Sequence, residues 1–365
     1  MTKTKKVKFL DLSVKDQNER LDLHKVLERC LDHGQFVMGH EIENLEDKLS
    51  KFVGRKHCIS VSSGTDSIYL ALKALDIGYG DEVITTPLSW IATANAIAMT
   101  SAKPIFCDIK NDLNIDPSSI KKVITSKTKA VVSVDYTGNL ADYDQLEEIT
   151  KSNNLLLIQD GSQSFGSSYR GRMCGSFGSI SGISHNPMKV FGGLGEIGSI
   201  YTDDDEIAER LKILRYNGTI NKEFLKYKSL NFRADALQAA FLSLRFENLA
   251  VKMEKRRRIA EKYSKAFSKL CEIPSETKNS KRVFYTYTIQ CDQRNELMKY
   301  LSENNIETKI QHPLLMSQQK PYLNCLSESP NALRIVKRIL CLPIHESLEQ
   351  DDVDYVIEKV TEFFS

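Results

Sequence analysis

The sequence predicts an α/β protein: a large domain on a mostly parallel sheet covered on both faces, then a smaller α+β domain. Short apolar runs alternate with helical patterns between about residues 57 and 201, and parallel strands require such crossover helices. From about residue 235 a long helical stretch follows, and the pattern then changes to strand-like runs and a closing helix. We therefore expect a large domain over residues 1–245 and a small domain over residues 246–365.

Seven apolar runs are expected to form the strands of the large sheet. They are HCISVSS, EVITT, KPIFCDI, AVVSVDY, LLLIQD, SISGIS and GSIYT. Between the first two lies TDSIYLALKALDIG, in which Ile68, Leu72 and Leu75 share one face and Gly78 follows the end. That pattern is typical of an amphipathic crossover helix.

The C-terminal third predicts different elements. The segment ADALQAAFLSLRFENLAVKMEKRRRIAEKYSKAFSKL is rich in good helix formers and predicts a long helical spine that leads into the small domain. After it, RVFYTYTIQCD and IETKIQH are expected as strands, and DDVDYVIEKVTEFF as a closing helix.

Composition narrows the function classes. The 50 basic and 48 acidic residues are mixed along the chain, so no nucleic-acid partner is expected. The start, MTKTKKVKFLDL, lacks the apolar core of a signal peptide, and no apolar run is long enough to span a bilayer, so we expect a cytoplasmic protein without a membrane partner. The 8 cysteines and 7 histidines are scattered without a C-x-x-C pair or a recognised metal spacing. They predict neither a disulfide framework nor a metal site.

Two strand ends of the large sheet carry candidate site residues, and open α/β sheets bind their ligands at such ends. The turn SSGTDS opens a helix, so backbone N–H groups near Gly64 and Thr65 could receive a phosphate, although an ordinary turn capped by Thr65 or Asp66 explains it too. The run LLLIQDGSQSFG places Asp160 at the tip of a strand with Gln163 beyond it. This carboxylate could hold a cationic ring nitrogen or could merely cap a turn.

Lys189 lies in GISHNPMKVFGGLGEIGSIYT, after a proline-containing turn and before a glycine-rich stretch. A Schiff-base lysine needs an apolar, tightly packed setting, whereas most lysines are simply exposed. The same stretch matches G-x-G-x-x-G at Gly193, Gly195 and Gly198. A dinucleotide fingerprint follows a strand and opens a helix, but a strand-like run follows here, so the pattern does not favour a Rossmann dehydrogenase.

In this order, the features resemble the DegT/StrS-type sugar aminotransferases, which have the aspartate-aminotransferase fold (fold type I). The resemblance begins at FLDL, continues through HGQFVMGHEIENLEDKLSKFVGRKHCISVSSGTDSIYLAL, GDEVITTPLSWIATANAI, LLIQDGSQSFGSSYRG, the lysine loop and NFRADALQAAFL, and ends at CLPIHESL. It covers nearly the whole chain. It implies pyridoxal phosphate (PLP) as cofactor, with its amine form PMP arising during turnover.

The resemblance also implies a role for each candidate residue. Lys189 would form the Schiff base with PLP and move the proton, and Asp160 would pair with the pyridine nitrogen. Gln163 would hydrogen-bond the ring oxygen, and Trp90, in PLSWIATA, would stack on the ring.

The implied phosphate site consists of the backbone at Gly64 and Thr65, the hydroxyl of Ser184, and Asn231 from a partner subunit. A homodimer is therefore expected. Taken singly, Trp90 could be plain core, Ser184 a turn residue and Asn231 a helix cap.

One departure concerns the substrate. Family members often carry a histidine and a tyrosine near the start of the C-terminal substrate loop, where this chain has Gln311 and His312 in IQHPLLMSQQKPYL. Both are candidate substrate contacts, although an ordinary surface histidine remains an alternative for His312. His185, close to Lys189, is a further candidate for the lining of the pocket.

The implied reaction transfers an amino group from an amino acid, with L-glutamate as the expected donor, to a keto sugar carried on a nucleotide. Three alternatives remain open: another small keto substrate such as a keto phosphate, a PMP-dependent sugar dehydratase, and a non-catalytic sugar-binding relative. The dehydratase replaces the lysine with histidine, and the non-catalytic relative would lack Lys189, Asp160 or Gln163, so this sequence disfavours both.

Overall fold

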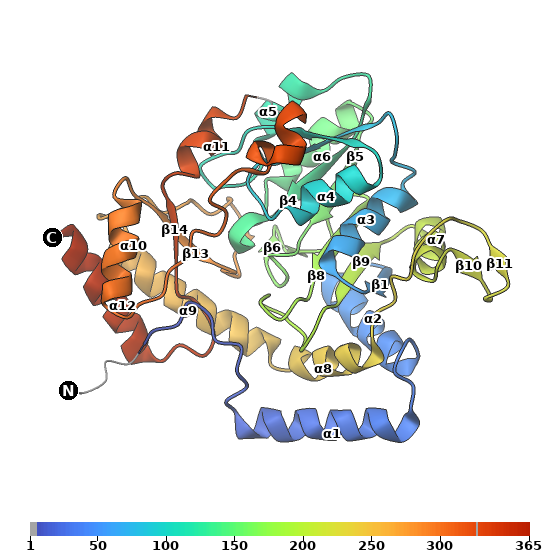
Figure 1. Cartoon of the computed structure of the whole chain (residues 1–365), viewed down its shortest axis with the longest axis horizontal. Coiled ribbons are helices and arrows are strands. Elements are labelled where there is room, and N and C mark those ends of the chain that lie inside the picture. The colour runs from blue at the N-terminus through green and yellow to red at the C-terminus, as the bar shows by residue number, and fades with distance from the viewer. Residues whose placement is uncertain (1–5, 326–327) are drawn as a thin grey trace.

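The structure, a computed structural model, describes residues 6–325 and 328–365 (Figure 1). The elements in chain order are α1 (Gln17–His33), α2 (His40–Val53), β1 (His57–Val61), α3 (Gly64–Ala74), β2 (Glu82–Thr85), α4 (Ala92–Met99), β3 (Lys103–Phe106), α5 (Pro117–Val123), β4 (Thr128–Val134), α6 (Tyr143–Ser152), β5 (Leu156–Asp160), β6 (Ser168–Tyr169), β7 (Arg172–Met173), β8 (Ile180–Ser184), β9 (Gly198–Thr202), α7 (Asp205–Arg215), β10 (Thr219–Ile220), β11 (Phe224–Leu225), α8 (Ala236–Phe246), α9 (Leu249–Phe267), β12 (Ser280–Lys281), β13 (Tyr287–Gln290), α10 (Arg294–Glu303), α11 (Pro330–Ile335), β14 (Ile339–Leu342) and α12 (Gln350–Phe364). Short 3₁₀ turns lie at Tyr136–Gly138, Met316–Gln318 and Lys320–Cys325.

The seven predicted runs form one seven-stranded sheet in the order β1-β9-β8-β5-β4-β2-β3. β9 runs antiparallel to both of its neighbours, and the pairs β8–β5, β5–β4, β4–β2 and β2–β3 are parallel. Six strands therefore point the same way. Their carboxyl ends share one edge of the sheet, which is where ligands bind in such folds.

Both faces of the sheet are covered, as predicted. Successive strand residues face opposite sides, so in β4 Val131 packs with the core of α2, α6 and α8, whereas Ala130 and Val132 pack with that of α3, α4 and α7. The strands are consequently short and apolar throughout, the pattern that a doubly covered parallel sheet requires.

The C-terminal part differs from the prediction in two places. The long helical stretch is two helices, because the chain leaves helical geometry at Asn248 (φ −99°, ψ 3°) between α8 and α9; asparagine is a weak helix former that favours such ends. The segment IETKIQH forms no strand: it makes only isolated bridges, Val7 with Ile306 and Lys309 with Cys341. The partner of β13 is β14 instead.

A separate core packs α9, β13, α10, β14 and α12 together, and Val7 from the start of the described chain belongs to it. This core lies to one side of the large sheet, beside α9 (Figure 1). The boundary between residues 245 and 246 falls at the end of α8 and stays a prediction.

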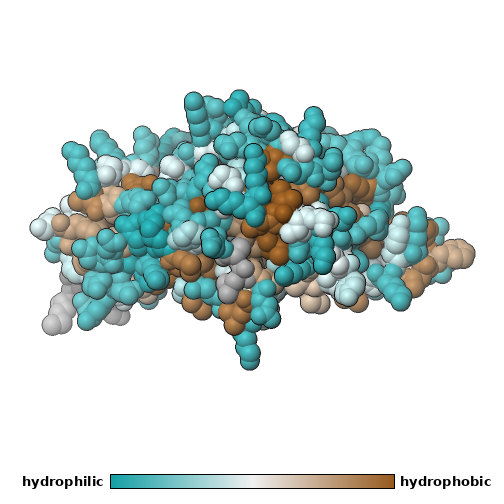
Figure 2. Space-filling model, turned by 90° about the horizontal axis from the view of Figure 1, so that it is seen from above, coloured by the Kyte–Doolittle hydropathy of each residue, from teal (hydrophilic) through white to brown (hydrophobic). Residues whose placement is uncertain are grey.

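Across residues 6–325 and 328–365, none of the helices combines the length and the apolarity that a bilayer crossing demands. The face seen in Figure 2 is mainly hydrophilic, with apolar side chains in patches, including the end that carries the β10–β11 hairpin. Phe224 and Leu225 in that hairpin, and Leu230 just after it, are each more than 60% exposed.

Candidate active site

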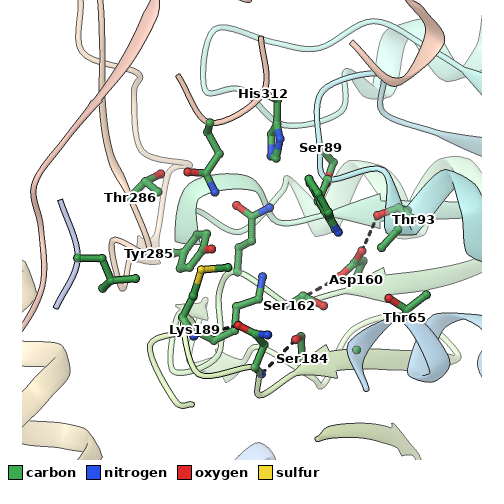
Figure 3. A pocket seen from close by; sticks show the side chains of 18 of the residues that line it. Thr65, Ser89, Thr93, Asp160, Ser162, Ser184, Lys189, Tyr285, Thr286 and His312 are labelled. Carbon is green, nitrogen blue, oxygen red and sulfur yellow. Dashed lines mark hydrogen bonds between the residues drawn. The ribbon is translucent and has the colours of Figure 1, made fainter. Parts of the chain in front are cut away.

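A cavity of about 550 Å³ opens at the carboxyl edge of the large sheet. Loops after β1, β2, β5 and β8 form one wall, and small-domain segments around Tyr285 and residues 307–312 form the other (Figure 3). The predicted residues that line it are Gly64, Thr65, Trp90, Asp160, Gln163, Ser184, Lys189, Gln311 and His312. Residues more than two hundred positions apart in the sequence thus meet in one cavity.

The N-terminus of α3 forms one end of the cavity. Its cap is Ser63, whose Oγ accepts the N–H of Asp66 at 3.1 Å, so neither Thr65 nor Asp66 has that role. A helix leaves its first N–H groups without intrahelical partners, and those of Gly64 and Thr65 lie at the cavity. A Cβ on Gly64 would lie 2.3 Å from Cβ of Ser184. Only glycine permits this approach, which places the Ser184 hydroxyl beside a helix N-terminus suited to an anion.

Asp160 ends β5, and its side chain is 5% exposed. Both carboxylate oxygens are held: Oδ2 accepts from Thr93 Oγ1 at 2.8 Å and Oδ1 accepts from the Ser162 N–H at 3.2 Å. Sequence reasoning missed Thr93, although it lies only three residues after Trp90. These bonds fix the orientation of the carboxylate toward the cavity, which a cationic partner requires.

Gln163 has one orientation of its amide. Its Oε1 accepts the backbone N–H of Thr137 at 3.0 Å. The Nε2 group is therefore the end that remains as a hydrogen-bond donor to a ligand. The site thus offers a donor from Gln163 beside an acceptor from Asp160.

Lys189 lies in the tight loop between β8 and β9. Its N–H donates to the carbonyl of Asn186 at 2.8 Å, and Asn186 Oδ1 accepts the N–H of Met188 at 2.9 Å. The amine lies 4.8 Å from the centre of the Tyr285 ring and points to the middle of the cavity in Figure 3. A cation–π contact of this kind holds an amine in place without neutralising it. Tyr285 was not predicted, because FYTYT reads only as a strand.

Trp90 and His312 lie on the opposite side of the cavity from Ser184. Their ring centres are 6.2 Å apart, and the indole of Trp90 is 61% exposed toward the opening. Burial lowers the pKa of His312 to about 4, and the positive charges of Lys189 and Lys309 lower it further in the same direction. The ring is therefore neutral at physiological pH.

His185 does not line the cavity, contrary to the prediction. It directly follows Ser184 and turns the other way, because adjacent residues of an extended chain alternate sides. Its Nε2 lies 2.8 Å from Ser199 Oγ and its Nδ1 lies 3.2 Å from the carbonyl of Phe191, and burial lowers its pKa to about 4. It belongs to the core beneath the lysine loop.

Asn231 is not brought to this cavity within the chain. It is exposed beside the β10–β11 hairpin, and its Oδ1 accepts from Arg233 Nε at 2.8 Å. Its backbone bridges Tyr216. An exposed position away from the chain's own site is compatible with a contribution to the site of another subunit.

One group among the described residues has ligand atoms close enough for a metal ion: Cys30, His33 and Glu41, within 4.8 Å of one another. Their ligand atoms are already engaged. Arg29 donates to Glu41 Oε1 at 3.0 Å, and His33 Nδ1 accepts the Gln35 N–H at 3.0 Å, so a neutral His33 ring carries its proton on Nε2. We assign no metal to this group.

Comparison with known proteins identifies the family. Residues 17–361 match the model of the DegT/DnrJ/EryC1/StrS aminotransferase family. The chain belongs to this family. The predicted family and the α/β fold are confirmed, and so is the prediction of an aminotransferase.

Two curated relatives of the aminotransferase are each 34% identical to it. One is a dTDP-3-amino-3,6-dideoxy-α-D-galactopyranose transaminase from Aneurinibacillus thermoaerophilus, matched over 98% of this chain and 99% of that one. The other is a "pleiotropic regulatory protein" from Geobacillus stearothermophilus, matched over 98% of both chains.

Among solved structures, S. venezuelae DesV in complex with a ketimine intermediate superposes with a TM-score of 0.96 at 32% identity, over 99% of both chains. NtdA from Bacillus subtilis with bound PMP superposes with a TM-score of 0.91 at 29% identity, over 98% of this chain and 85% of that one. The predicted cofactor is thus the one that such structures contain.

The neutral state of His312 can be tested by NMR of histidine-labelled protein. We expect the His312 ring to titrate near pH 4, and we expect Lys309→Gln to raise its pKa because one nearby positive charge is removed. Lys337→Gln, which removes an exposed small-domain lysine, is the matched control and should leave the titration unchanged. A ring that titrates at its ordinary value of 6.5 would contradict the described environment.

Proposed function

We propose that this aminotransferase uses PLP at Lys189 to transfer an amino group from an amino acid, with L-glutamate as the expected donor, to a keto sugar carried on a nucleotide. One observation carries the proposal. Lys189, Asp160 and the cradle formed by Gly64, Thr65 and Ser184 line one cavity whose volume suits a cofactor and a substrate.

The residues present fit PLP in three respects. The α3 N-terminus and the Ser184 hydroxyl supply donors for a phosphate, and the space between them exists because Gly64 lacks a side chain. Asp160 supplies a fixed negative charge for a pyridinium nitrogen, and Gln163 supplies a donor for the ring oxygen. Lys189 supplies the amine.

When bound, PLP supplies an electron sink that stabilises negative charge at the substrate carbon. The side chains of this chain do the rest. Asp160 keeps the ring nitrogen protonated, because both of its oxygens are already oriented. Lys189 Nζ holds the cofactor and moves the proton at the substrate carbon. Trp90 covers the ring face and limits the access of water to it.

The nucleotide keto sugar is proposed from the relatives, because the transaminase from Aneurinibacillus thermoaerophilus is named for a dTDP-linked amino sugar. A keto phosphate remains the second candidate, since Gln311 and His312 differ from the usual histidine and tyrosine of the family. The dehydratase and the non-catalytic reading are disfavoured by Lys189 in the cavity beside Asp160 and Gln163.

We also propose a homodimer in which Asn231 of one subunit completes the phosphate site of the other. Asn231 lies beside the exposed apolar residues Phe224, Leu225 and Leu230. Exposed apolar groups of this kind gain free energy when a second surface covers them. A second copy of this chain would cover the hairpin and receive Asn231 at the same time.

The acceptor can be tested with a panel of dTDP- and UDP-linked keto sugars and small keto phosphates, with L-glutamate as donor. We expect turnover with at least one nucleotide sugar and a kcat/KM at least about 100-fold lower for keto phosphates, because these lack most of the binding groups. Turnover confined to keto phosphates would instead support the second candidate. The readout is formation of 2-oxoglutarate.

The shared site can be tested with mixed dimers of Lys189→Ala and Asn231→Ala chains that carry different tags. Each variant alone has only defective sites. In a mixed dimer one site regains both residues, so purified mixed dimers should show about half of the wild-type activity per dimer. If Asn231 serves its own chain, every site stays defective, and mixed dimers as inactive as the parents would refute the arrangement.

A further inference from the structure

The small-domain wall of the cavity carries a lysine that the roles above do not use. Lys309 lines the cavity together with Gln311 and His312. Its backbone is fixed to β14, since its N–H donates to the carbonyl of Cys341 at 3.1 Å and its carbonyl accepts from the Cys341 N–H at 2.9 Å. The base of this side chain is therefore held at a set position on the wall.

The charges around Lys309 are otherwise compensated. Arg256 pairs with Glu346 at 2.9 Å and also donates to the carbonyls of Phe284 and Ile344. Glu307 pairs with Lys6 and accepts the N–H of Phe9 at 3.0 Å. Both are thus satisfied within the protein and are not available to a ligand.

Lys309 differs from these two. Among the described residues it has no ion pair or hydrogen bond from its amine. Besides Lys189, it is the lysine or arginine of the described cavity lining that lacks a carboxylate partner. A cation kept in a cavity without a counter-ion is a binding group for an anion that arrives with a ligand.

His312 provides an independent observation on the same wall. It is 7% exposed and packs against Tyr136, with ring centres 5.6 Å apart. Its Nε2 is buried and lacks a hydrogen-bond partner among the described residues. Buried polar atoms normally have one, so the wall contains an unmet hydrogen bond as well as an unmet charge.

We propose that Lys309, with His312 beside it, binds an oxyanion of a substrate on the small-domain wall. The proposal rests on the proposed function, because the oxyanion belongs either to the side chain of an acidic amino donor or to the diphosphate of the acceptor. Both sources share one chemistry, an oxygen-borne negative charge that a lysine amine binds directly. Lys309 thereby selects between acidic and neutral substrates.

Binding can be measured without turnover because Trp90, the single tryptophan of the chain, lies in the same cavity. The PLP-loaded protein is titrated with inorganic pyrophosphate and, separately, with glutarate, and tryptophan fluorescence is followed. We expect Lys309→Gln to weaken the binding of at least one probe about 10- to 100-fold, the usual loss for a charged hydrogen bond. Lys309→Arg should retain most of the affinity, and Lys337→Gln should match the wild type.

The probe that is affected identifies the source. Loss of pyrophosphate binding assigns Lys309 to the acceptor, and loss of glutarate binding assigns it to the donor. The two half-reactions, followed separately by cofactor absorbance, should show the same assignment as a rise in KM with little change in kcat. Unchanged affinity for both probes in Lys309→Gln would overturn the proposal. A protein that binds pyrophosphate through Lys309 but aminates no nucleotide sugar would refute the proposed function alone.

Discussion

The close approach of α3 to the β8–β9 pair is the constraint on which the site depends. A Cβ on Gly64 would meet Ser184 at 2.3 Å, and a Cβ on Gly198 would meet the carbonyl oxygen of Ser63 at 2.3 Å. Two glycines from distant parts of the sequence therefore let the helix start between two strand ends. The same strand, β8, then leads into the lysine loop, so the anion cradle and the amine are positioned together.

The cavity divides the work between its two walls. The large domain holds groups that suit a cofactor, and each is fixed by a bond to its own neighbours: Asp160 by Thr93, Gln163 by Thr137, and the lysine loop by Asn186. The small domain supplies Lys309 and His312, which lack such bonds within the described residues. Groups that are satisfied inside the protein are already oriented for catalysis, whereas unsatisfied groups are available to a changing substrate.

Much of this arrangement follows from local sequence signals. The seven strands are predictable because each is a short apolar run buried on both faces, and Asp160 and Lys189 because they follow such runs directly. Other features depend on tertiary context. IETKIQH looks like a strand but makes only isolated bridges, since β14, far along the chain, pairs with β13 instead. Tyr285 and Lys309 reach the cavity only through the packing of the small domain, which no local pattern reveals. The orientation of His185 was predictable from its alternation with Ser184.

The account rests on the amine of Lys189 as the attachment point of PLP. Borohydride reduction of the PLP-loaded protein, followed by digestion and mass spectrometry, tests it most directly. We expect the added mass of the reduced cofactor on the peptide that contains Lys189, and no labelled peptide from the Lys189→Ala variant. A label on another lysine, such as Lys309, or labelling that persists in the variant, would contradict the account.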